Sequence, residues 1–286
     1  MKIIKYFFQF LIIIILFSIF KILGLRISSK LSGRLFKIIG PFFRSSILIH
    51  KNIKKALPDI NEKKIKKISD SMWENYGRIF AEYIFLKNYR NDKQKLNINI
   101  NGQEILDEIK KNNTPVVFVS GHFSNFELMA MHIERSGIKL SAIYRPLNNM
   151  FLNSIMEKIR KNFICKHQIK KGFGGIRELI RLHKKDYSTA LMIDQRVTEG
   201  IKSNFFNQEA FTTTIPAQLV KKFKIPVVPI FIERFDEIKF NITVNKPIYF
   251  SQDSSIHNIT EELNQILEKM ILKKPEQWIW SHNRWK

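Results

Sequence analysis

The sequence contains a single cysteine, and neither an internal repeat nor a low-complexity linker divides it. Cys165 has no second cysteine to pair with, so the chain cannot form an intramolecular disulfide. A cysteine-based metal site is excluded for the same reason. The residues around Cys165 predict a strand in which the thiol is half-buried. Without a linker or repeat, the second part of the chain is expected to form one domain.

Acidic residues are also scarce. The 286 residues include 48 Lys and Arg but only 25 Asp and Glu, which gives a formal net charge of +23. A field of this sign attracts anionic partners such as phospholipid headgroups, nucleic acid or phosphorylated substrates. A coding preference for lysine and asparagine would produce the same excess without any binding function. Hydrophobic residues make up 44% of the chain, which excludes a disordered protein.

Charged residues are absent between Tyr6 and Phe20. A helix needs about 20 apolar residues to cross a bilayer, and this segment with its flanks is long enough. No small-residue cleavage site follows it, so we expect an uncleaved membrane anchor over residues 1–25 rather than a cleaved signal peptide. Basic residues are more numerous after the segment than before it, which predicts that the rest of the chain lies in the cytoplasm.

Residues 26–92 are expected to form a helical, membrane-associated segment. Between residues 26 and 49, apolar and basic residues alternate with a helical period. Such a helix either lies on an anionic membrane surface or packs its apolar face into the protein core, and the pattern allows both. Asn61 is expected to cap a longer helix that ends near Leu86.

The remainder, residues 93–286, alternates short apolar runs with helical patterns. The predicted strands cover residues 96–100, 115–120, 140–145, 188–194, 226–234 and 240–248. The predicted helices between them cover residues 102–112, 125–135, 148–161, 174–185 and 214–224. This alternation predicts an α/β fold with a largely parallel central sheet flanked by helices, preceded by the anchor and the amphipathic helices. The runs at 115–120 and 226–234 are almost wholly apolar, so we expect them at the centre of the sheet.

His122 follows the predicted strand 115–120 directly. In sheets of this class the ligand crevice lies beyond the carboxyl ends of the strands, which is where this histidine would be. Glu127 is near enough for a curved loop to bring its carboxylate to the imidazole, and a histidine paired in this way is a competent general base. The spacing alone is weak support, because His257 and Glu262 repeat it without a buried strand before them.

Two further predicted strands also end in polar residues. Arg145 ends the strand 140–145, and Asp194 and Gln195 follow one another at the end of the strand 188–194. Taken singly, such an arginine is more often a surface cation, and such an aspartate more often a helix cap or an ion-pair partner. Taken with His122, they would present polar groups to one crevice.

Several motifs occur together along the chain. They are NIKKALP at 52–58, MWENYGRIFAEY at 72–83, GHFSNFEL at 121–128, the dipeptide at 194–195, and PEQWIWSHNRW at 275–285. With these motifs the sequence resembles the late acyltransferases of lipid A biosynthesis, the lauroyl or myristoyl transferase type within the lysophospholipid acyltransferase superfamily. The resemblance covers most of the chain and is more specific than any one motif.

The resemblance implies that His122 and Glu127 are the catalytic residues of an H-x-x-x-x-D/E motif. His122 would take the proton from an acceptor hydroxyl that attacks an acyl thioester without a covalent acyl-enzyme, and Glu127 would orient the ring. The substrate-binding residues implied are Asn125 inside the motif, Arg145 for a phosphate or the acceptor, and Asp194 and Gln195. One position departs from the pattern, because a serine stands at 124 where many relatives carry glycine.

The resemblance also implies the partners and the place of the reaction. Acyl carrier protein would donate the acyl chain, and a lipid A precursor in an anionic membrane surface would accept it. The enzyme would lie in the bacterial inner membrane, held by its single N-terminal anchor, with the catalytic domain at the cytoplasmic face. No metal and no bound organic cofactor is implied.

Three alternatives remain open from the residues. The acceptor could be another lipid, such as a glycerolipid. The protein could instead be an acyl-ester hydrolase with Ser120 as the nucleophile, although G-x-S-x-G is absent. A basic nucleic-acid-binding protein is disfavoured, because the aromatic residues fall in apolar runs, so no specific nucleic-acid partner is expected.

The chain ends in a segment rich in tryptophan. Trp278, Trp280 and Trp285 lie among its last residues. Tryptophan is enriched both at membrane interfaces and at buried positions that offer its N–H a partner. Of these two readings, core packing is the favoured one.

Overall fold

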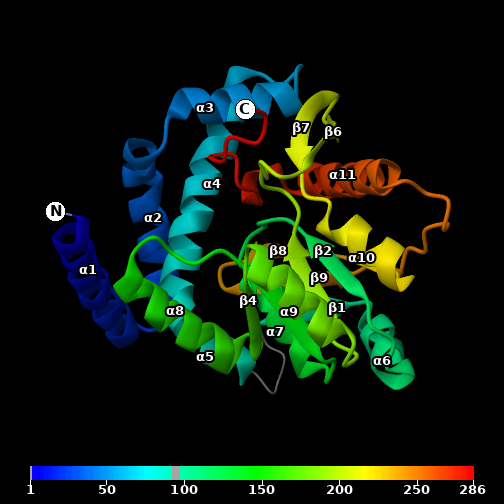
Figure 1. Ribbon diagram of the computed structural model, residues 1–286. Helices are drawn as coiled ribbons and strands as arrows, with labels where there is room; N and C mark the ends of the chain where they lie inside the picture. The colour runs from blue at the N-terminus through cyan, green and yellow to red at the C-terminus, as the bar shows by residue number, and fades with distance from the viewer. Residues whose placement is uncertain (1, 92–96) are drawn as a thin grey trace.

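The computed structural model describes residues 2–91 and 97–286 and has an α/β architecture (Figure 1). The main sheet has seven strands in the order β1-β9-β8-β2-β5-β3-β4. The strands are β1 (Ile98–Asn101), β2 (Val117–Ser120), β3 (Leu140–Tyr144), β4 (His167–Lys170), β5 (Ser188–Met192), β8 (Val227–Asp236) and β9 (Lys239–Val244). All neighbours in this sheet are parallel except β8 and β9. The predicted, largely parallel sheet is therefore confirmed.

The two most apolar strands lie at the centre of the sheet. β2 is the fourth of the seven strands, and β8 is beside it. Every residue of β2 is buried, as are the first six of β8. The continuous apolar runs follow from this position, because a central strand of a parallel sheet is covered on both faces.

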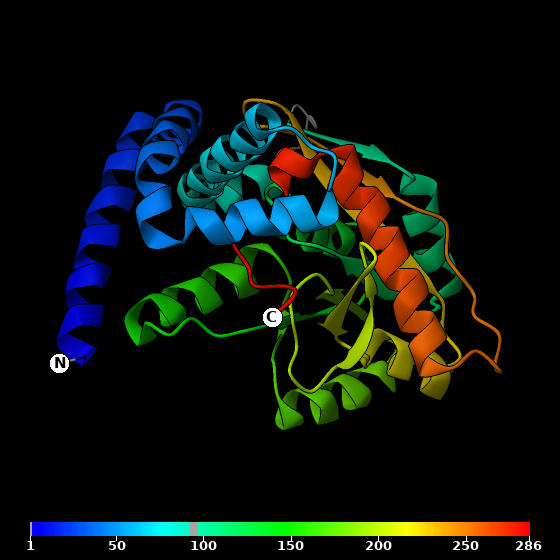
Figure 2. The ribbon, with the colours of Figure 1, turned by 90° about the horizontal axis from the view of Figure 1, so that it is seen from above.

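Helices cover both faces of the sheet. They are α6 (Gln103–Asn112), α7 (Glu127–Arg135), α8 (Met150–Phe163), α9 (Phe173–His183), α10 (Ile215–Phe223) and α11 (Ile256–Lys273). Right-handed crossovers predict that α6 and α7 lie on one face and α9 and α10 on the other. Figure 2 shows α6 and α9 on opposite sides of the sheet.

A layer of helices precedes the sheet. It consists of α1 (Lys2–Leu23), α2 (Leu25–Phe43), α3 (Ser46–Ala56), α4 (Glu62–Glu82), a 3₁₀ turn η1 (Tyr83–Phe85) and α5 (Leu86–Arg90). Asn61 caps α4 as predicted, since its side chain accepts the N–H of Lys64 at 2.9 Å. The domain boundary expected between residues 92 and 93, and the predicted strand start at residue 96, lie outside the described residues.

α1 is long and apolar enough to cross a membrane, judged by its length and composition. Phe20 is buried against the rest of the protein. Other large apolar side chains of the helix, Ile12 and Ile22 among them, are exposed. This helix could therefore anchor the protein to a membrane.

α2 has small residues on its inner face and most of its large apolar residues on its outer face. The buried residues are Ser28, Ser29, Ser32, Gly33 and Gly40. The exposed large apolar residues are Ile27, Leu31, Leu35, Ile38, Phe42 and Phe43. The small residues allow α2 to approach α4 closely, and a Cβ atom on Gly77 of α4 would lie only 2.2 Å from the Ser32 carbonyl oxygen. The core-packing alternative is therefore wrong for most of the large apolar residues of α2, although Phe36 packs against Phe80 of α4 with 5.4 Å between the ring centroids. In contrast, α3 buries apolar side chains.

Three strands and the surroundings of the cysteine differ from prediction. The edge strand β4 and the two-stranded hairpin of β6 (Ile201–Phe205) and β7 (Gln208–Thr212) are absent from the predicted set. The prediction of a half-buried strand residue at Cys165 is wrong, because Cys165 lies in the connection between α8 and β4 and is buried, with its thiol 3.0 Å from the Leu140 carbonyl oxygen. Burial raises the pKa of this thiol to about 12, so the thiol is unreactive.

Candidate active site

The register of two central strands brings His122 and Asp194 together. β2 and β5 are parallel neighbours in which Ser120 pairs with Met192. His122 and Asp194 each lie two residues further along, so they leave the sheet side by side. The His122 N–H donates to Asp194 Oδ2 at 2.7 Å, and His122 Nδ1 lies 2.8 Å from Asp194 Oδ1.

Asp194 orients the imidazole. Its side chain is completely buried, and Oδ2 also accepts the indole N–H of Trp278 at 2.9 Å. An ionised carboxylate can only accept, so the neutral His122 ring carries its proton on Nδ1. This tautomer leaves Nε2 as the basic nitrogen. The ring also packs edge-on against Phe126, with 4.8 Å between the ring centroids.

Glu127 occupies a different place from the one expected. Its carboxylate was predicted to orient the His122 ring, but Oε1 accepts hydrogen bonds from Arg160 Nε at 2.8 Å and Nη2 at 2.5 Å. The helix α7 begins at Glu127, where the positive end of the helix dipole also favours a carboxylate. The ring is held by Asp194 instead, because strand register places Asp194 opposite His122.

The two carboxylates together hold the pKa of His122 above its ordinary value of 6.5. Burial alone would lower this pKa, but the charge and hydrogen bond of Asp194, helped by the charge of Glu127, outweigh it, while Arg160 acts in the opposite direction. Burial would in turn raise the pKa of Asp194, yet its contacts with His122 and Trp278 bring it below the usual range. The site thus favours a positive imidazolium beside a negative aspartate.

We expect kcat/KM to increase with pH through a pKa above 6.5. A general base accepts a proton only when it is neutral, and a raised pKa means that the neutral ring appears at higher pH. Initial rates measured between about pH 5 and pH 9 would locate this limb. A limb below 6.5 would show that the contact with Asp194 does not raise the pKa of the base.

The loop between β2 and α7 contains a strained serine. Ser124 is fully buried and has a φ of 41°, in the left-handed region that favours glycine. Its N–H donates to the Gln277 carbonyl oxygen at 3.0 Å, which fixes the backbone in this conformation. The departure from glycine at this position therefore carries a conformational cost.

Replacing Ser124 with glycine should raise the free energy of unfolding by up to about 1 kcal/mol, because relief of left-handed strain exceeds the entropy cost of glycine. Ser141→Gly is the matched control, since Ser141 is also a buried serine but lies in the extended strand β3. There the same change should lower the free energy of unfolding by about 1 to 2 kcal/mol, because it adds the entropy cost of glycine and removes the hydrogen bond from the Ser141 hydroxyl to the Ser188 carbonyl oxygen. Thermal unfolding in detergent would compare the two. Equal losses in both variants would contradict the strain at Ser124.

The other predicted substrate-binding residues are more scattered. Asn125 is 1% exposed and donates its side-chain amide to Glu82 Oε2 at 3.0 Å, inside the protein. Gln195 is half-buried one residue after Asp194, and Arg145 is exposed just beyond β3. β3 is two strands away from β2, so the structure places Arg145 at the same edge of the sheet as His122 but not beside it.

Three residues contribute to the site in ways that the sequence did not predict: Arg160, Glu82, and Trp278 through its hydrogen bond to Asp194. Arg160 lies on α8, outside the sequence motifs that indicated the site. Glu82 lies within MWENYGRIFAEY, but nothing in that motif points to a contact with the loop of His122. The prediction that the terminal tryptophans pack in the core is confirmed for Trp278 and Trp280, which are 2% and 0% exposed, whereas Trp285 is only half-buried.

The hydrolase alternative finds little support in the geometry. Ser120 is buried on β2, and its hydroxyl lies 3.5 Å from both the Gly121 carbonyl oxygen and the Met129 sulfur. The hydroxyl is thus engaged by these two groups, and the hydrogen bond of the His122 ring is made to Asp194. Among residues 2–91 and 97–286, no three side chains of His, Cys, Asp or Glu gather closely enough to bind a metal ion.

Comparison with known proteins gives a consistent result over the whole chain. A family model described as bacterial lipid A biosynthesis acyltransferase matches residues 1–286. The lipid A biosynthesis myristoyltransferase of Escherichia coli (strain K12) is 24% identical over 253 residues, which cover 87% of this chain and 76% of that protein. The lipid A biosynthesis acyltransferase of Haemophilus influenzae is 24% identical over 261 residues, covering 89% and 81%.

Proposed function

Since the chain belongs to the bacterial lipid A biosynthesis acyltransferase family, and is thereby an O-acyltransferase of that type, we propose that it transfers a fatty acyl chain from acyl carrier protein to a hydroxyl of a lipid A precursor. The observation that carries the mechanism is the contact between His122 Nδ1 and Asp194 at 2.8 Å. It leaves Nε2 of a partly exposed ring to act as the general base.

In the proposed reaction, His122 Nε2 takes the proton of the acceptor hydroxyl as its oxygen bonds to the thioester carbon. The carbon–sulfur bond then breaks, and the imidazolium returns the proton to the departing thiolate. Asp194 stabilises the imidazolium through its hydrogen bond, and Glu127 stabilises it through its negative charge. Arg160 holds the Glu127 carboxylate in position. His122 and Glu127 thus act together, but without direct contact.

Charge and surface features support the proposed partners. Acyl carrier proteins are acidic, so a net charge of +23 would accelerate their encounter with the enzyme. A phosphorylated acceptor would be attracted by the same field, with the exposed Arg145 as one candidate contact. Cations enriched after α1 support a position at the cytoplasmic face of the inner membrane.

The proposal is tested with the purified full chain in mixed micelles, labelled acyl carrier protein as donor, and a tetra-acylated lipid A precursor as acceptor. A product with one additional acyl chain is expected. If acyl groups were transferred only to a glycerolipid, the acceptor would be a glycerolipid and not a lipid A precursor. If they were transferred only from acyl coenzyme A, the donor would be acyl coenzyme A and not acyl carrier protein. Release of free fatty acid without any acylated lipid would favour the hydrolase instead.

A further inference from the structure

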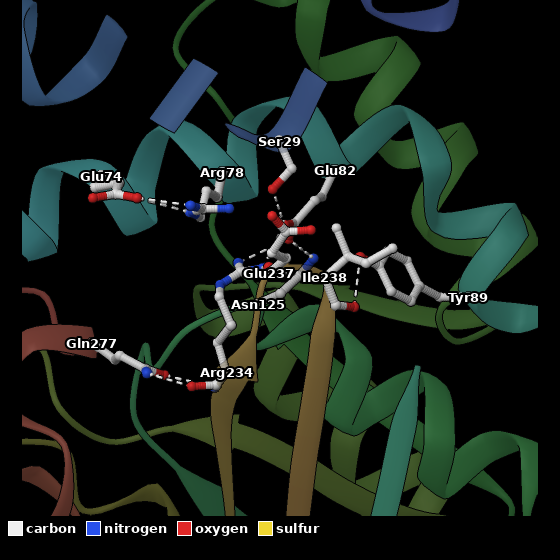
Figure 3. A network of polar contacts seen from close by, with 10 residues as sticks. All are labelled: Ser29, Glu74, Arg78, Glu82, Tyr89, Asn125, Arg234, Glu237, Ile238 and Gln277. Atoms are coloured by element: carbon white, nitrogen blue, oxygen red, sulfur yellow. Dashed lines mark hydrogen bonds and ion pairs between the residues drawn. The ribbon is translucent and has the colours of Figure 1, made fainter. Parts of the chain in front are cut away.

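A buried carboxylate lies behind the catalytic loop. Glu82 is the last residue of α4, is 0% exposed and accepts four hydrogen bonds (Figure 3). Its Oε1 accepts the Ser29 hydroxyl at 2.7 Å and Arg234 Nη1 at 2.6 Å. Its Oε2 accepts the Asn125 amide and Arg234 Nη2, each at 3.0 Å. One side chain thus joins α2, α4, the loop of residues 121–126 and β8.

Gln277 holds the same loop from another side. Its backbone carbonyl accepts the N–H of Ser124, as described above, and its side chain exchanges two hydrogen bonds with the backbone of Arg234, at 2.7 and 2.8 Å. Figure 3 shows Gln277 and Glu82 at opposite ends of Arg234. The contacts therefore close into a ring through Glu82, Asn125, Ser124, Gln277 and Arg234.

This closed set of contacts fixes the position of the loop of residues 121–126 more than it adds to the free energy of unfolding. A buried ion pair is offset by the cost of removing both charges from water, but it tolerates little movement, because displacement leaves a charge without its partner. Ser124 and Asn125 are the second and third residues after His122, so the loop cannot shift while both are held. The contact between His122 and Asp194 depends on that placement.

We propose that Glu82 and Asn125 are positioning residues, which hold the catalytic loop so that the His122 ring stays within hydrogen-bonding distance of Asp194. The inference rests on the proposed function of His122 as the base. Asn125 then acts inside the protein through Glu82 and does not contact the substrate. The interaction of Ser29 with the same carboxylate extends the positioning to α2.

The variant Asn125→Ala tests the inference without changing any charge. We expect it to lower kcat about 10- to 100-fold, because small displacements of a catalytic group have effects of this size. We also expect the pKa of His122 to fall towards 6.5 as the Asp194 contact loosens. The groups that face His122 remain unaltered in this variant, and they are Asp194, Glu127, Arg160 and His282. The pKa is measured by NMR on histidine-labelled protein in micelles, with the His122 signal assigned by its loss in His122→Asn.

Glu74→Gln is the matched control. Glu74 lies on α4 and pairs with Arg78 at 2.8 Å, two turns before Glu82, without touching the loop (Figure 3). It should leave both kcat and the pKa of His122 unchanged. The double variant Glu82→Ala with Asn125→Ala should be no less active than Glu82→Ala alone, because the contact between residues 82 and 125 is already lost in the single variant.

Ser29→Ala provides a milder second variant if Asn125→Ala fails to fold. It removes one of the four hydrogen bonds and should move kcat and the His122 pKa in the same direction by a smaller amount. A wild-type His122 pKa in folded Asn125→Ala or Ser29→Ala, together with wild-type kcat, would overturn the inference. The NMR titration does not depend on turnover. If the wild-type protein transferred no acyl chain but Asn125→Ala still lowered the pKa of His122, the proposed function would be overturned and the positioning role of Asn125 would stay intact.

Discussion

Replacing His122 with asparagine should reduce acyl transfer by about 10²- to 10⁴-fold, the usual contribution of a positioned general base. Asparagine is the informative replacement, because its amide nitrogen can take the position of Nδ1 and keep the hydrogen bond to Asp194. The basic Nε2 is lost, while the buried carboxylate retains a donor. The temperature of thermal unfolding should therefore stay close to that of the wild type. The loss of activity should appear in kcat, measured with acyl carrier protein as donor and the lipid acceptor.

The chain supplies its own control for this experiment. His257 and Glu262 repeat the spacing of His122 and Glu127, but His257 is exposed in the first turn of α11. His257→Asn should leave transfer unchanged. Equal activity of His122→Asn and His257→Asn would eliminate His122 as the base and return the search to other groups at this edge of the sheet.

Asp194→Asn should cause a loss of similar size, about 10²- to 10⁴-fold. The asparagine oxygen can still accept the N–H groups of His122 and Trp278, but its amide nitrogen then faces Nδ1 as a donor. The ring is driven to the tautomer with its proton on Nε2, which cannot accept another. Without the negative charge, the pKa of His122 should also fall below its raised value, so the acid limb of kcat/KM moves to lower pH.

The result of Asp194→Asn shows which carboxylate supports His122, Asp194 or Glu127. Asp186→Asn is the control, because Asp186 is an exposed aspartate that lies within 3.5 Å of Lys139, and asparagine tolerates its left-handed backbone. Full activity and an unmoved acid limb in Asp194→Asn would mean that Glu127 alone supports His122, as the sequence motif suggests. Loss confined to Asp194→Asn would make Asp194 the partner of the base.

Much of the fold was predictable because its signals are local. The apolar runs of β2 and β8 indicate strands covered on both faces, and the alternation with helices indicates parallel connections. β4 escaped prediction because His167–Lys170 is short, mostly polar and at the edge of the sheet. The β6–β7 hairpin also has mixed, half-exposed residues that give no apolar run.

The partner of His122 was not predictable from spacing. Glu127 is five residues away in the chain, whereas Asp194 is 72 residues away but adjacent through the β2–β5 register. That adjacency depends on strand order, in which β5 inserts between β2 and β3 although it follows both in the sequence. A polar residue at the end of a strand is visible in a sequence, but the strand beside which it lies is not.

The outward-facing apolar side of α2 has a consequence for how the protein is made. The inner face of α2 carries serine and glycine, and its outer face carries leucine, isoleucine and phenylalanine. In water, this helix would bury more apolar surface if it rotated about its axis and placed its outer face against the protein. We therefore expect assembly of this layer to need an amphiphile from the start. Synthesis without lipid or detergent should yield chains whose sheet forms but whose first helices aggregate, and adding lipid afterwards should rescue few of them.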